Sequence, residues 1–112
     1  MINVEDLKHS LEEQYDPAVV LWRVNDHDPE VQLHIFMMIK QQVIRLDFGF
    51  NPNIEEASID HWMDIIAGII EGEKNEVRKM VAQLEKDPEA SARGRETFEN
   101  AKKGIWPKVL GG

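Results

Sequence analysis

The chain has 112 residues, of which 42% are hydrophobic and 30% charged, and this composition predicts one globular domain with a core of its own. It contains no cysteine, which excludes disulfides, thiol chemistry and zinc sites built on thiolates. Residues 1–6 lack the basic and apolar segments of a signal peptide, and the longest apolar run, 35–39, is far too short to span a membrane. We therefore expect a soluble, cytoplasmic protein with no membrane partner.

The net charge of −8 is distributed unevenly along the chain. Residues 1–72 contain 14 acidic and 4 basic side chains, whereas residues 73–112 contain 7 acidic and 9 basic ones. Affinity for nucleic acid comes from Lys and Arg side chains that neutralise phosphates, so we expect no direct nucleic-acid binding. The acidic part instead favours a protein partner with a basic surface, although a solvated acidic face is the simpler interpretation of the same charges.

Three Asp-Pro pairs divide the sequence, and each is typical of a helix start. The Asp side chain can cap the helix, and Pro fits the first helical position, where its missing N–H costs nothing. The pairs are Asp16-Pro17, Asp28-Pro29 and Asp87-Pro88. Together with the apolar spacing, they predict helices over 4–13, a short one up to 24, then 29–47, 54–71, 74–85 and 88–104.

The predicted fold is therefore all-α, a compact bundle of five to six short helices with 29–47 and 54–71 at its centre. The second of these has the clearest helical stripe, formed by Ile59, Trp62, Met63, Ile66, Ile69 and Ile70. Residues 43–50 also fit a strand, because apolar side chains alternate there with Arg45, Asp47 and Gly49. We favour the helix for this segment, because the sequence offers no second convincing strand with which it could pair.

We divide the chain into a single helical domain over residues 1–104 and an apolar C-terminal tail over 105–112. The tail is too apolar for a simple linker, so it either folds back onto the domain or binds a partner. Trp is a preferred anchor at protein interfaces. The residues that we expect to bind a partner are the tail's Trp106, Ile105, Val109 and Leu110, and the acidic Asp26, Asp28 and Glu30.

Two pairs of residues have the spacing of metal ligands on a helix. Glu30 and His34 are four residues apart in the predicted helix 29–47, and His61 and Asp64 are three apart in the helix 54–71. Carboxylate and imidazole side chains from neighbouring helices can together hold a divalent transition metal. Such pairs also arise by chance in an acidic helical protein, and these flank the apolar stripes. We therefore expect no metal and no cofactor.

The sequence contains no catalytic motif, so we expect no enzyme activity. The function that we predict is non-catalytic protein binding, as a small acidic regulatory, inhibitor or adaptor protein. Immunity proteins and phage-encoded inhibitors are analogous only as a class. Two alternatives stay open: a metal-binding bundle that acts as an enzyme or sensor, and a structural subunit of a larger assembly. A homodimer is a further option, because the 29–47 segment carries more apolar residues than one stripe needs.

Overall fold

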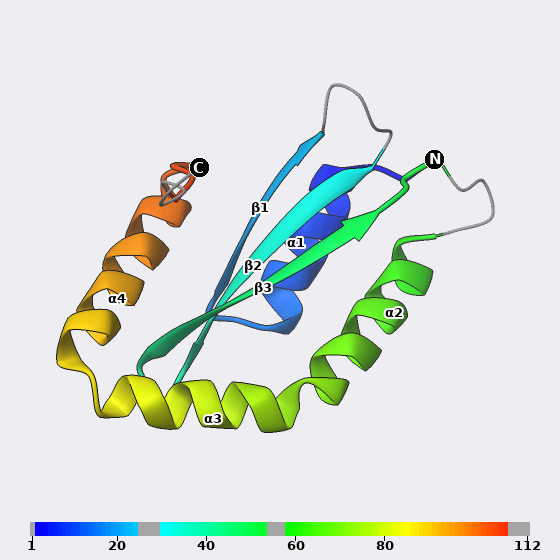
Figure 1. Ribbon diagram of the computed structural model, residues 1–112. Coiled ribbons are helices and arrows are strands. Elements are labelled where there is room, and N and C mark those ends of the chain that lie inside the picture. The colour runs from blue at the N-terminus through cyan, green and yellow to red at the C-terminus, as the bar shows by residue number, and fades with distance from the viewer. Residues whose placement is uncertain (1, 25–29, 54–57, 108–112) are drawn as a thin grey trace.

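The computed structural model describes residues 2–24, 30–53 and 58–107 (Figure 1). Within these ranges the chain forms an α+β fold with four helices and one three-stranded antiparallel sheet. In chain order the elements are α1 (Val4–Gln14), β1 (Ala18–Val24), β2 (Val31–Ile39), β3 (Gln42–Phe50), α2 (Ile59–Gly72), α3 (Lys74–Glu85) and α4 (Pro88–Lys102).

The prediction of an all-α bundle is wrong. The segment predicted as the central helix 29–47 forms β2 and most of β3, and the segment predicted as a short helix up to 24 forms β1. A two-residue turn at Lys40 and Gln41 joins β2 to β3. Both residues have positive φ angles, 50° and 68°, which is the backbone conformation that matches the twist of a tight hairpin. Asp28 and Pro29, the predicted start of the central helix, lie outside the described residues.

The strand β2 lies between the other two strands, so the sheet order is β1-β2-β3. Its register pairs Leu21 of β1 with His34, and Asp47 of β3 with the same His34. The helix favoured for residues 43–50 is therefore wrong: this segment is the strand that its alternation also fitted, and β2 supplies the partner strand that the sequence did not reveal. Antiparallel neighbours of this kind need three strands and a packed face for stability, and both are present here.

Helices cover the sheet on both faces. α1 and α2 pack on one face, where the largest cluster of buried residues includes Leu7 of α1, Leu33 of β2 and Ile66 of α2. α3 packs on the same side, with Val77 and Val81 against Ile44 of β3. α4 covers the opposite face, where a separate cluster consists of Val19, Leu21, Phe36, Phe98 and Ala101. Because both faces are covered, the strands carry apolar residues on both sides.

The helix predictions outside the sheet are confirmed. α3 spans Lys74–Glu85 as expected, Asn3 caps α1, and Asp87 caps α4 with Pro88 in its first turn. α2 begins later than predicted, at Ile59, because Ser58 accepts a hydrogen bond from the N–H of His61 and so caps the helix. None of the helices in the described ranges is both long enough and apolar enough to cross a membrane.

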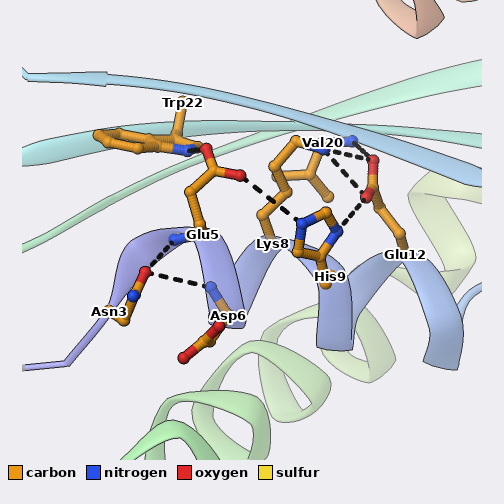
Figure 2. A network of polar contacts seen from close by, with 8 residues as sticks. All are labelled: Asn3, Glu5, Asp6, Lys8, His9, Glu12, Val20 and Trp22. Carbon is orange, nitrogen blue, oxygen red and sulfur yellow. Dashed lines mark hydrogen bonds and ion pairs between the residues drawn. The ribbon is translucent and has the colours of Figure 1, made fainter.

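Acidic side chains of α1 form hydrogen bonds with residues of the edge strand β1 (Figure 2). The backbone N–H of Val20 donates to the Glu12 carboxylate at 3.1 Å, and the same carboxylate bonds to Nζ of Lys8. The indole Nε1 of Trp22 donates to Glu5 at 2.7 Å. An edge strand leaves alternate backbone groups without a strand partner, and such groups invite pairing with another chain. Glu12 supplies one of those N–H groups with an acceptor from within the chain.

Candidate functional site

The last turn of α4 directs the chain back onto the sheet. Gly104 has a φ of 77°, a left-handed conformation that Gly adopts without steric cost. Its N–H donates to the carbonyl of Ala101, and the N–H of Ile105 donates to the carbonyl of Asn100. These two bonds form the Schellman pattern that ends many helices. The turn brings Trp106 over the part of the sheet that lies beyond α4.

Trp106 contacts the sheet through two side chains from different strands. Its ring meets that of His34 edge to face, with ring centroids 4.8 Å apart and an interplanar angle of 78°. The guanidinium of Arg23 lies 4.7 Å from the centroid of the Trp106 ring, which is a cation–π contact. Nε of Arg23 also donates to Gln32, at 3.4 Å. Trp106 is thus half-buried and fixed in position, while the adjacent Ile105 is 51% exposed.

A second group of polar side chains adjoins this one on β2 and β3. Nδ1 of His34 lies 3.2 Å from Oδ1 of Asp47, but the approach lacks the direction of a hydrogen bond, and this buried nitrogen has no hydrogen-bond partner among the described residues. Nε of Arg45 lies 3.2 Å from the same Asp47 oxygen. We call the surface formed by Arg23, Gln32, His34, Arg45, Asp47 and Trp106 the Trp106 face.

The surroundings of His34 favour its neutral form. Burial lowers the pKa of its imidazole below 6.5, since its side chain is only 16% exposed and a charge there would lose water. The carboxylate of Asp47 acts in the opposite direction, and the positive charges of Arg45 and Arg23 lower the pKa further. His34 is therefore uncharged at neutral pH, and it serves the Trp106 face as a polar aromatic ring.

We expect His34 to make the protein less stable in mildly acidic solution. Above pH 6.5, His34 is neutral in both the folded and the unfolded chain, and folding does not change its protonation. As the pH falls below 6.5, the unfolded chain takes up the proton first, so the free energy of unfolding decreases until the lowered folded-state pKa is reached. Urea unfolding at about pH 7.5 and about pH 5.5 measures this decrease.

His34→Gln should reduce that pH-dependent decrease, because the substituted side chain does not titrate. The matched control is His61→Gln, which removes an exposed imidazole from α2. If both variants changed the pH dependence equally, the proposed difference in protonation of His34 between the folded and unfolded chains would be wrong.

A shallow depression of about 320 Å³ overlaps the Trp106 face. Glu30 lies over Gly49 there: a Cβ atom at position 49 would come within 2.5 Å of the Glu30 carboxylate, so a larger residue would displace that side chain. None of the described lining residues carries a hydroxyl or a thiol. They are Arg23, Glu30, Gln32, His34, Asp47, Phe48 and Gly49. The depression offers charged, amide and imidazole groups for recognition.

The structure brings together some of the residues predicted from sequence. Glu30 and His34 line the same depression, Trp106 packs on His34, and Ile105 is adjacent to Trp106. The remaining residues predicted to bind a partner lie outside the described residues: Asp26, Asp28, Val109 and Leu110.

The four suggested metal ligands do not converge. His34 lies on the face of the sheet that Trp106 contacts, whereas His61 and Asp64 are exposed on α2, which packs on the opposite face. Only His61 and Asp64 lie on a helix, as predicted. Glu30 lies just before β2 and His34 lies within it, so these two residues are not one helical turn apart. The described part of the chain contains no group of three His, Cys, Asp or Glu residues placed to hold a metal ion.

Sequence reasoning missed Arg23, Arg45 and Asp47 as members of a site. The available signal was the alternation in residues 43–50, because it places Arg45 and Asp47 on one face of a strand. Arg23 had no such signal, since its position next to Trp106 depends on how β1 pairs with β2.

Part of the acidity of residues 1–72 gathers in a groove between α1 and α2. Glu13 of α1 and Asp60 and Asp64 of α2 line this groove, which has a volume of about 750 Å³. No basic side chain is among the described residues that line it. The groove lies on the side of the sheet covered by α1 and α2, opposite the Trp106 face.

No protein-family model matches the chain, and comparison with curated proteins and with solved structures gives no significant match. A functional proposal therefore rests on the geometry of these surfaces.

Proposed function

We propose that the protein is a non-catalytic, cytoplasmic protein-binding module of the regulatory, inhibitor or adaptor kind, and that it binds its partner through the Trp106 face. The observation that carries this proposal is the packing of Trp106 against Arg23 and His34, directly after the exposed Ile105 in the chain. Trp and Arg are the residues most enriched among those that dominate binding energy at protein interfaces. A cytoplasmic location agrees with a chain that contains no cysteine.

The contacts around Trp106 support binding because they reduce its entropic cost. Ordering a flexible side chain at an interface costs about 0.5–1.5 kcal/mol. Arg23 and His34 already hold the Trp106 ring, and Gln32 already holds Arg23. Fewer side chains therefore have to be ordered when a partner binds. Arg45 and Asp47, each about half exposed, form a polar rim that can orient a partner.

The groove between α1 and α2 supports the expectation of a basic partner. Its three carboxylates, from Glu13, Asp60 and Asp64, give it a negative charge that would attract Lys and Arg side chains. A partner that needs this groove should bind less tightly as the salt concentration rises, because salt screens exposed charges. The salt dependence thus separates this surface from the Trp106 face, which carries charges of both signs.

Affinity capture from extracts of the native host tests the proposal. We expect the intact chain to retain a specific protein and Trp106→Ala to bind it about tenfold or more weakly, as for central interface residues elsewhere. Lys103→Ala, a change at a nearby exposed position, should leave binding unchanged.

Neutralising the acidic groove in the variant Glu13→Gln/Asp60→Asn/Asp64→Asn provides the second arm of the experiment. A partner lost by this variant, but retained by Trp106→Ala, would place the interface on the α1–α2 side. That result would overturn our assignment of the Trp106 face, while retaining protein binding as the function.

A further inference from the structure

A cavity of about 370 Å³ lies between the last residues of β2, Tyr15 at the end of α1, and the residues around the α2–α3 junction. Its apolar lining consists of Tyr15, Met37, Met38, Ile39, Ile70 and Val77. This volume is at the lower end of the range of about 300–1,000 Å³ typical of small-molecule sites, which are also mostly apolar with few polar groups.

The polar groups of the cavity are concentrated on one wall, where α2 ends and α3 begins. They are Glu71, Lys74 and Arg78. Nζ of Lys74 lies 3.1 Å from the Glu71 carboxylate, so these two charges largely compensate each other. Arg78 has no acidic partner within ion-pair distance among the described residues. The net charge of this wall is therefore positive, in a chain whose overall charge is −8.

The junction between α2 and α3 adds little to this charge. Glu73 is both the C-cap of α2 and the N-cap of α3, so the negative end of one helix dipole lies beside the positive end of the other and offsets it. The positive charge available to an anionic group therefore comes from Arg78.

We propose that this cavity binds a single-chain carboxylate, with the alkyl chain among Met37, Ile39 and Ile70 and the carboxylate against Arg78. Methionine is suited to such a lining because its flexible side chain adapts to an unbranched apolar chain. The guanidinium of Arg78 can donate two parallel hydrogen bonds to a carboxylate, which a neutral head group would not accept equally well. This site is independent of the protein-binding function proposed for the Trp106 face.

An NMR titration of the full chain with decanoate, kept below its micelle concentration, tests the proposal. We expect the methyl signal of Met37 to shift, while those of Met63 and Met80, which do not line the cavity, stay in place. The sole tyrosine, Tyr15, gives a second local reporter. Decanol should bind more weakly, because it has no charge for Arg78 to pair with.

Two charge reversals on α3 test the role of Arg78. Arg78→Glu should weaken decanoate binding about tenfold or more, equivalent to about 1.4 kcal/mol. Lys79→Glu causes the same change in net charge on a side chain outside the cavity, and it should leave the affinity unchanged. Arg78→Lys, which keeps the positive charge, should retain most of the binding.

Three results would overturn the proposal: no shift at Met37, equal affinity for decanol and decanoate, or equal losses from Arg78→Glu and Lys79→Glu. Because the partner-capture experiment uses variants on other surfaces, its failure and the failure of this titration can be told apart.

Discussion

Phe98→Ala should lower the free energy of unfolding by about 3–5 kcal/mol, the usual cost of removing a fully buried aromatic side chain. Phe98 is 2% exposed, and it packs into the cluster formed with Phe36 and Leu21 of the sheet. The other buried residues of α4, Ser91 and Ala101, are small. Phe98 therefore supplies most of the apolar contact that holds α4 on the sheet.

Phe98→Ala should also disturb the Trp106 face. Trp106 follows α4 in the chain, so its position on the sheet depends on the position of the end of α4. The N-terminal part of α4 has a separate attachment, where the Ser91 hydroxyl donates to Gln42 and Arg95 donates to Ser91. We therefore expect the C-terminal half of α4 to detach first. Hydrogen exchange should show increased exchange at residues 98–104, and partner binding should weaken.

Urea unfolding of the wild type, Phe98→Ala and Phe98→Leu measures the stability effect. Phe98→Leu keeps most of the buried apolar volume, so its loss should be well below that of Phe98→Ala. A loss below about 1 kcal/mol for Phe98→Ala would mean that α4 is held by other contacts, since such a value is typical of exposed positions.

The helices outside the sheet could be predicted because their signals are local. α3 has an amphipathic pattern, and its bounds match the expected residues 74–85. Two of the Asp-Pro pairs show how the following residues decide the outcome. Pro88 is followed by Glu-Ala-Ser-Ala and begins a helix, whereas Pro17 is followed by Ala-Val-Val-Leu-Trp and precedes a strand. The β-branched and aromatic residues of the second segment favour a strand, and that preference outweighed the capping signal.

The sheet could not be recognised because its local signals were masked. β2 alternates apolar and polar residues only over 31–35, and residues 36–39 are all apolar, so the segment as a whole resembles a buried helix. The hairpin turn at Lys40 and Gln41 contains neither Gly nor Asn, the residues that usually mark a tight turn. Because no residue indicated a turn, the sequence of the two strands was predicted as one long helix.

Only part of the candidate site could be predicted from the sequence, for the same reason. Trp106 and His34 could be singled out by their chemistry, without knowledge of the fold. The contact of His34 with Asp47 depends on the β2–β3 register, which places these residues directly opposite each other. When residues 29–47 are predicted as a helix, the β2–β3 register is not predicted. The proximity of His34 and Asp47 in the Trp106 face is then not predicted either.

Leu33→Ala should destabilise the protein by about 2–5 kcal/mol, and the comparison with Ile39→Ala tests the strand assignment of β2 directly. Leu33 is 0% exposed at the centre of the face covered by α1 and α2, whereas Ile39 is only partly buried, at the hairpin end. In a helix over 29–47, Ile39 would lie on the main apolar stripe and Leu33 at its margin. The sheet therefore predicts the larger loss for Leu33→Ala, and the helix predicts the reverse order. Urea unfolding of both variants under one condition decides between them: a larger loss for Ile39→Ala would contradict the sheet, and with it the register on which the Trp106 face depends.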